Sequence, residues 1–217
     1  MKTGRRGMLF VAADVAREDE EDFNEWYDRE HLEDRVRMKG VTAASRYVAV
    51  DGGPKYLALY WAGSIQAFDS PEYAHAFTNQ TPWSQKVLPK MRAPTRRIGE
   101  LSAEVGKGNG GFVAVLPLFL DGTPEPLSER CAALGEALAR QPGFVRSYLL
   151  TPDETLSRPL PLEDLAARRM EPIFIIESSS TRSNESALSE AIANLPCSPA
   201  ATARYALAWN LESRECA

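Results

Sequence analysis

The chain has 217 residues, of which 44% are hydrophobic and 25% charged, a composition typical of a globular protein with a buried core. The formal net charge is -5 at pH 7 and no long basic run occurs, which argues against a nucleic acid partner. No stretch approaches the roughly 20 apolar residues that span a bilayer, so we expect no membrane partner. Three cysteines without close spacing argue against disulfides or a zinc cluster and favour a cytoplasmic protein.

The first half predicts the order strand, helix, strand, strand, helix, strand. Apolar residues 8–15 predict a buried strand, and the acids at 18–22 suit the start of a helix because they complement its dipole. That helix runs toward Gly40 and places Phe23, Trp26/Tyr27 and Glu30/His31 on one face. The remaining expected elements are strands at 41–50 and 56–62, a helix from Ser70-Pro71 to about Asn79, a short helix or loop at 82–92, and a strand at 94–105.

The same order returns after residues 106–111, a glycine-rich segment that predicts a flexible linker. Strands are expected at 112–120, 143–150, 173–177 and 202–211, helices at 127–140 and 185–194, and an insertion at 151–171 with a short helix around 162–169. Local similarity supports a duplication, since Ser45-Arg46-Tyr47 is echoed by Arg146-Ser147-Tyr148 roughly 100 residues later. We therefore divide the chain into an N-terminal repeat (1–105), the linker and a C-terminal repeat (112–217).

These elements predict an α+β fold in which each half is a four-stranded antiparallel sheet with helices on one face. The uncovered sheet face must be buried against something. In a duplicated chain the two sheets can pack face to face and close a barrel, with the helices outside. A cavity can then remain between sheet and helix, or at the mouth of the barrel.

His31 is the strongest candidate for chemistry, because it lies on the apolar face of the first helix, beside Glu30 and one turn from Tyr27. It could be a general acid or base tuned by a pocket and a neighbouring carboxylate, or a hydrogen-bonded structural histidine. Arg46 on the second strand needs a carboxylate or an anionic ligand if it points into the barrel, and is solvated if it points outward. Strand alternation does not decide between these two orientations.

Aromatic residues supply candidates for binding and for hydrogen bonding. Tyr27, Tyr47 and Tyr60 could each donate a hydrogen bond to a developing oxyanion. Trp26 is expected to pack the helix on the sheet, and Trp83 either closes a cavity mouth or fixes its loop to the sheet. His75 is expected at the surface and Cys131 in the core. Metal-ligand spacing and phosphate-binding glycine loops are missing from the sequence, so we expect no metal and no cofactor.

The segment from Phe23 to Leu32, followed by Gly40-Val41 and Ser45-Arg46-Tyr47, resembles the dimeric α/β-barrel superfamily and, within it, the EthD-like branch. The resemblance covers roughly residues 7–105, whereas the second half matches in element order and lacks the histidine. It implies two ferredoxin-like repeats forming an intrachain barrel, in a superfamily that usually forms homodimers. A homodimer of fused barrels is therefore a further expectation. The superfamily includes cofactor-independent monooxygenases, polyketide cyclases, lactone isomerases and chlorite dismutases, so the fold alone does not give the reaction.

Our leading hypothesis is an enzyme that acts without metal or cofactor on a small apolar or aromatic carbonyl compound, in a monooxygenase-, cyclase- or isomerase-like reaction. In it His31 transfers a proton and Tyr27 or Arg46 stabilises the oxyanion, while the ligand is bound by Trp26, Tyr47, Tyr60 and Trp83. The alternative is a non-catalytic ligand-binding or assembly module, which the missing histidine of the second half favours. Haem binding is a third possibility, for which the second half offers no histidine ligand.

Overall fold

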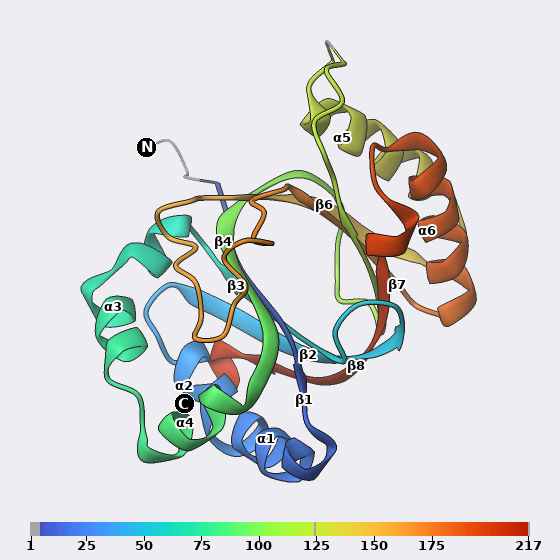
Figure 1. Cartoon of the computed structure of the whole chain (residues 1–217). Helices are drawn as coiled ribbons and strands as arrows, with labels where there is room; N and C mark the ends of the chain where they lie inside the picture. Colours follow the sequence, from blue (N-terminus) through green and yellow to red (C-terminus); the bar gives the residue numbers. More distant parts are fainter. Residues whose placement is uncertain (1–4, 124, 217) are drawn as a thin grey trace.

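The computed structural model describes residues 5–123 and 125–216, and within them eight antiparallel strands form a closed barrel with helices outside (Figure 1). The strands are β1 (Gly7–Val15), β2 (Val41–Asp51), β3 (Tyr56–Ala62), β4 (Met91–Gly106), β5 (Phe112–Pro117), β6 (Phe144–Pro152), β7 (Ile173–Ser178) and β8 (Ala203–Glu212). The helices are α1 (Glu20–Trp26), α2 (Leu32–Val36), α3 (Pro71–Thr78), α4 (Pro82–Val87), α5 (Leu127–Leu138) and α6 (Thr181–Asn194).

The two halves of the chain each contribute four neighbouring strands to this barrel. The strand order is β1-β3-β2-β8-β5-β7-β6-β4, so the first half supplies β4-β1-β3-β2 and the second supplies β8-β5-β7-β6. Pairing of β2 with β8 and of β4 with β6 joins the halves and closes the sheet. The closed barrel and the α+β class are therefore as predicted. Between β4 and β5, the Gly110 N–H donates to Glu177 Oε2 at 2.8 Å, so this glycine-rich segment is anchored to the barrel.

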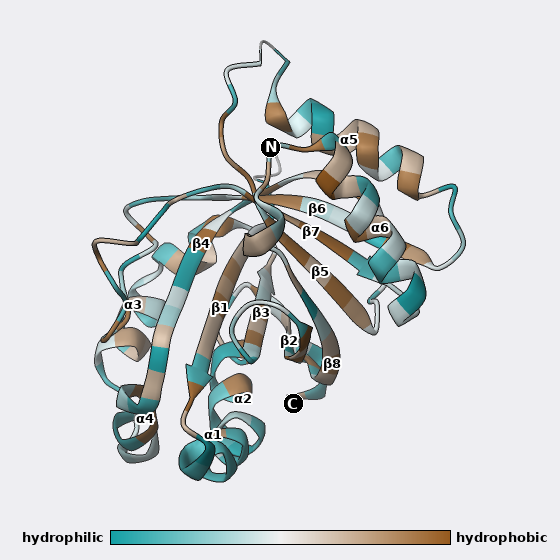
Figure 2. Ribbon diagram, turned by 45° about the vertical axis from the view of Figure 1, so that its right-hand side comes forward, coloured by the Kyte–Doolittle hydropathy of each residue, from teal (hydrophilic) through white to brown (hydrophobic). Residues whose placement is uncertain are grey.

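The interior of the barrel is a packed core. Apolar residues run along the strands (Figure 2), and alternate side chains from all eight strands meet inside. Tyr47, Trp61, Tyr148 and Tyr205 are among the buried side chains that fill it. An eight-stranded barrel is just wide enough for its own side chains. Ligand-sized space must therefore be found outside the barrel wall.

The helices form two outer layers of different character. In the second half, α5 and α6 pack small and medium aliphatic side chains, including Cys131, Leu138 and Ala191, closely against the sheet. Cys131 is fully buried, as predicted, and burial raises the pKa of its thiol to about 12. In the first half, α1 to α4 pack larger residues such as Phe23 and Trp26. Among the described residues, no helix is long and apolar enough to cross a membrane.

The predicted helix around residues 162–169 is wrong, because this part of the insertion forms turns. Leu162 has a left-handed backbone conformation, with φ at 67°. The Asp164 carboxylate accepts hydrogen bonds from the N–H groups of Ala166 (2.9 Å) and Ala167 (3.3 Å). Such local side-chain to backbone bonds compete with helix formation and stabilise turns.

Residues 153–171, which we call the strap, cover a free edge of the barrel in place of a strand. β6 pairs with β4 only from Gly99 onward, which leaves the earlier part of β4 without a partner on that side. The strap forms hydrogen bonds with the backbone of β4 there. The Asp153 N–H donates to Ile98 O at 2.7 Å, and the Ser157 hydroxyl bonds both the N–H and the carbonyl of Ile98 at 2.9 Å. An unpaired strand edge is thus protected.

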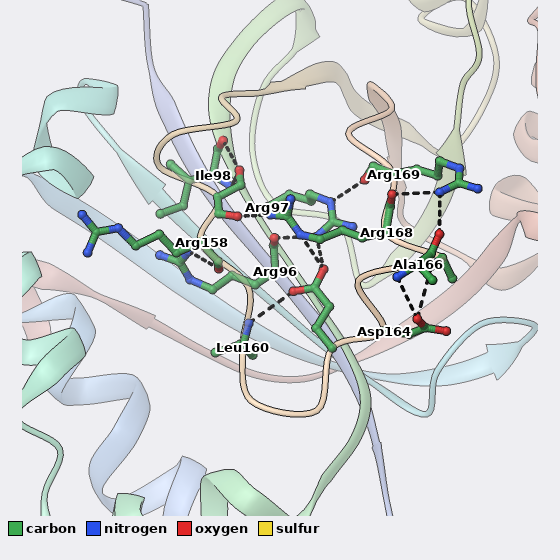
Figure 3. A network of polar contacts seen from close by, with 12 residues as sticks. Arg96, Arg97, Ile98, Arg158, Leu160, Asp164, Ala166, Arg168 and Arg169 are labelled. Atoms are coloured by element: carbon green, nitrogen blue, oxygen red, sulfur yellow. Dashed lines mark hydrogen bonds and ion pairs between the residues drawn. The ribbon is translucent and has the colours of Figure 1, made fainter.

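A buried ion pair holds the strap to β4 (Figure 3). Arg97 Nη1 lies 2.6 Å from Glu163 Oε1, and the two side chains are only 6% and 4% exposed. Arg97 Nε also donates to the Arg169 carbonyl at 2.9 Å, and Glu163 Oε2 accepts from the Leu160 N–H at 3.2 Å. Arg168 Nε adds a second positive contact to Glu163 at 3.2 Å. One desolvated carboxylate, that of Glu163, therefore contacts two arginines and a backbone N–H of the strap and β4.

We predict that Glu163→Gln loosens the strap, because the Arg97 guanidinium then stays buried without its counter-charge. Breaking a buried pair by neutralising one partner costs about 3–5 kcal/mol. Urea unfolding should show this loss, and trypsin should cleave the strap faster at Arg168 or Arg169. Glu154→Gln is the matched control, since Glu154 is an exposed residue of the same strap. Equal stability and equal cleavage of the two variants would contradict the assigned role of Glu163.

Candidate functional site

A cavity of about 350 Å³ lies between the outer face of the first-half sheet and the helices that cover it. β1, β3 and β4 form its floor, the first helical segment and α3 form its walls, and the strap contributes its roof. The lining residues are Leu9, Val11, Tyr27, His31, Arg35, Tyr60, Tyr73, Phe77, Gln80, Leu88, Met91, Arg96, Pro159, Leu160 and Pro161. The lining is predominantly apolar with a few polar groups, as in typical small-molecule sites.

His31 and Tyr27 belong to a π-helical turn that connects α1 to α2. Residues 27–31 form this turn, in which the Leu32 N–H donates to the Tyr27 carbonyl, five residues back. Such a turn brings residues four and five apart onto the same face, and π-turns are frequent at functional sites. The His31 ring accordingly lies 4.1 Å from the Trp26 ring and 5.2 Å from the Tyr27 ring, measured between centroids. The predicted face is present in part: Tyr27 and His31 lie at the cavity wall, whereas Glu30 points toward Thr81.

The surroundings of His31 keep its imidazole neutral. Its pKa is lowered well below 6.5, first by burial and then by the positive charges of Arg35 and Arg46. The neighbouring carboxylate does not tune it, because Glu30 Oε1 accepts from the Thr81 hydroxyl at 2.5 Å on another side of the helix. Among the described residues no hydrogen bond to the imidazole is found, so it is not fixed to the backbone. A neutral, unpaired imidazole can accept a proton.

Two tyrosines supply hydroxyl groups near this base. Tyr27 and Tyr60 both line the cavity and are buried, and burial raises the pKa of each phenol. Among the described residues, no hydrogen bond of normal geometry satisfies the Tyr60 hydroxyl. The Tyr27 phenol is close enough to perturb its pKa without completing such a bond. A buried hydroxyl without a partner is costly, so Tyr60 is an available donor for a ligand.

Arg46 lies on the outer face of β2, beneath α1, and not inside the barrel. Its guanidinium is 2.5 Å from Asp28 Oδ1 and donates to Asn24 Oδ1 at 2.8 Å. It also stacks over the Tyr27 ring, with 4.3 Å from the guanidinium carbon to the ring centroid. This resolves the orientation that strand alternation left open. Arg46 contacts the cavity indirectly, through the Tyr27 ring.

The structure places three further predicted residues away from the cavity. Trp26 is fully buried in the helix layer and donates its indole N–H to the Ser84 hydroxyl at 3.1 Å. Trp83 donates to Asp22 at 3.0 Å and so fixes α4 to α1. Tyr47 points into the barrel, on the opposite face of the sheet. His75, the other histidine, is exposed on α3, as predicted.

Sequence reasoning missed several residues that line the cavity. Arg35 follows Tyr27 and His31 at four-residue intervals, so helical spacing was a usable signal for it. Arg96 gave no such signal, because its cavity position depends on contacts with the distant strap. Its guanidinium donates to the carbonyls of Leu156 and Arg158 and to the Tyr73 hydroxyl, each at 2.9 Å. The strap residues themselves belong to the other half of the chain.

Comparison with known proteins gives a fold but no close relative. No family model matches the sequence, and no curated protein matches it. Three solved structures are similar over both halves. An anthrone oxidase-like protein has a TM-score of 0.64 and 14% identity, covering 100% of this chain and 96% of that chain. A "putative monooxygenase" of Fusobacterium nucleatum has a TM-score of 0.59 and 10% identity, and the match covers 98% of this chain and 96% of that chain. A "putative monooxygenase" of Lactobacillus acidophilus has a TM-score of 0.59 and 11% identity, and the match covers 96% of this chain and 97% of that chain.

The structures similar to this chain are dimeric α/β-barrel proteins, and the likeness extends over the full length of the molecule. It agrees with the closed eight-stranded barrel and with the outer helices on both halves. Identities of 10–14% carry the fold and not the reaction. The chain therefore has the dimeric α/β-barrel fold, with both halves of the barrel supplied by one polypeptide.

Proposed function

We propose that the protein is a cofactor-independent enzyme that removes a proton from a small apolar or aromatic carbonyl compound. The observation that carries this proposal is the neutral, unpaired imidazole of His31 at the wall of an apolar cavity. The cavity volume of about 350 Å³ falls near the lower end of the roughly 300–1,000 Å³ that ligand sites occupy, which suits a small substrate.

His31 acts as the general base and takes the proton next to the carbonyl group. The negative charge that develops on the carbonyl oxygen receives a hydrogen bond from Tyr60, whose buried hydroxyl has no hydrogen-bond partner of normal geometry among the described residues. Tyr27 is the second donor. Trp26 stacks against the imidazole and fixes its plane, and Arg46 positions the Tyr27 ring from behind.

Proton removal is the step shared by oxygenation, isomerisation and cyclisation of such compounds. The likeness to an anthrone oxidase-like protein and to two "putative monooxygenases" supports an oxygenation that starts from an aromatic ketone. In that case O₂, as co-substrate, takes one electron from the deprotonated carbon and then combines with it to form a peroxide. Proton uptake and loss of water from this peroxide leave a new carbonyl group at what was a CH₂ carbon. An isomerase would instead return the proton to another carbon and would turn over without oxygen.

Haem is not part of this proposal. The chain has two histidines, and the second half contains none. His75 is exposed, and one face of the His31 ring is covered by Trp26 at 4.1 Å. Among the described residues, no group of three His, Cys, Asp or Glu side chains is placed to hold a metal ion. The second half therefore supplies no histidine ligand for a haem.

We also infer that the two halves are ferredoxin-like repeats derived from a duplication. The identical strand order in both halves, with the two helical layers in corresponding places, supports this inference. Only the first half keeps a histidine on its first helix. An EthD-like ancestry for that half, the division at residues 106–111 and a cytoplasmic location stay predictions.

We predict that His31→Gln removes catalysis while leaving the fold intact, because glutamine keeps a polar side chain but cannot act as the base. General base catalysis contributes about 10²–10⁴-fold, and the rate should fall by that factor. The measurement is enzyme-catalysed exchange of the acidic C–H of anthrone and of smaller aryl ketones in D₂O, followed by NMR. His75→Gln is the matched control. An unchanged exchange rate in His31→Gln would refute the base assignment.

We predict that His31 makes stability depend on pH in the acid range. The folded-state pKa is below the unfolded value of about 6.5, so below that pH the unfolded chain binds a proton that the folded chain does not. The free energy of unfolding therefore falls as pH drops from about 6.5 toward the folded-state pKa. In His31→Gln this slope should decrease by up to about 1.4 kcal/mol per pH unit, measured by urea unfolding. His75→Gln should retain the wild-type slope.

A further inference from the structure

Arg35 is a cation at the cavity wall that forms no ion pair with any residue the structure describes. Its guanidinium contacts the Gln80 side-chain oxygen at 3.3 Å, and no carboxylate among the described residues lies within 4.0 Å of it. The acids nearby are engaged elsewhere or diverge. Glu33 pairs with Arg37 at 2.5 Å, and Glu30 bonds to Thr81. Asp34, the adjacent residue, is exposed.

Arg96 is a second cation of the same cavity with neutral partners only. The three groups that accept its hydrogen bonds are two backbone carbonyls and the Tyr73 hydroxyl. It is 3% exposed, so its charge is poorly hydrated. None of the residues that line the cavity is an aspartate or a glutamate. The cavity thus combines an apolar lining with two positive charges and no negative charge.

This charge balance distinguishes the cavity from other parts of the fold. Arg46 is paired with Asp28, Arg97 with Glu163 and Arg146 with Glu177, each at 2.5–2.8 Å. The protein therefore compensates its other buried arginines with carboxylates. Burying a cation without a counter-charge is costly, whereas a ligand that brings the missing anion gains charge-assisted hydrogen bonds.

We propose that the ligand of this cavity is an aromatic anion, a flat apolar body carrying one carboxylate, which Arg35 binds through its planar guanidinium. Arg96 adds positive potential from the opposite, strap-covered side. This inference rests on the proposed function, because it names the substrate class of the same cavity. Arg35 follows His31 by about one helical turn, so both side chains reach the same cavity from successive turns of one helical segment. Arg35 is thus a specificity-determining residue.

The test compares two probes of the same shape, 2-naphthoate and its neutral analogue 2-naphthamide, by calorimetry at pH 7.5. The naphthoate should bind the wild-type protein at least about tenfold more tightly, which corresponds to 1.4 kcal/mol. Arg35→Gln should abolish this preference, and Arg35→Lys should retain most of it because the charge stays. Arg37→Gln is the matched control, since Arg37 is exposed and lies two residues further along the chain. Far-UV circular dichroism establishes that each variant is folded.

A second measurement reports on the same site without depending on affinity. The chain has only two histidines, so the ring protons of His31 can be assigned by comparison with His75→Gln. Bound naphthoate neutralises Arg35 and should raise the pKa of His31, whereas naphthamide should not. This shift should be absent in Arg35→Gln.

Equal affinity for the two probes, or a preference that survives in Arg35→Gln, overturns the proposed anion site. That result is separate from the test of His31. Loss of proton exchange in His31→Gln together with equal probe affinities would leave the base in place and remove the anionic substrate. Naphthoate preference with unchanged exchange in His31→Gln would keep the binding site and remove the catalytic role.

Discussion

The filled interior of the barrel is the constraint that determines where this protein can bind anything. Eight strands enclose just enough space for their own side chains, and here tyrosine and tryptophan residues occupy it. A ligand must therefore lie outside the wall, between the sheet and a helical layer. Whether such space exists depends on how closely the helices approach. In the second half, α5 and α6 pack mainly leucine, isoleucine and alanine side chains against the sheet.

In the first half, the helices pack larger aromatic side chains against the sheet, and a cavity lies between the two layers. Its first helix changes to a π-turn at residues 27–31, directly after a segment rich in aromatic residues. The turn places His31 against Trp26 and Tyr27 and lets it face the cavity. Arg46 supports this arrangement from the sheet, held by Asp28. The chemistry proposed for His31 thus depends on an irregularity of the helix as much as on the residue.

The sequence predicted the architecture well because the fold follows from local patterns. Strand periodicity, the cap at Ser70 and the need to bury two open sheet faces were sufficient for the barrel. The aromatic and histidine face of the first helix was also predictable from helical spacing. The orientation of Arg46 was not, since it depends on Asp28 and Asn24 across the helix–sheet contact. The strap was predicted in part as a helix because its turns are set by Asp164 and by long-range contacts to β4.

The strap, which belongs to the second half of the chain, also contacts the cavity of the first half. Pro159, Leu160 and Pro161 close a cavity whose base and walls belong to the first half, and the ion pair of Arg97 with Glu163 joins the two. The two halves therefore contribute different parts of the cavity. In the proposed function the reacting groups belong to the first half, so substitutions in the strap can change the size and access of the binding space without altering those groups. The half that lacks a histidine thereby becomes the part through which substrate range can diversify.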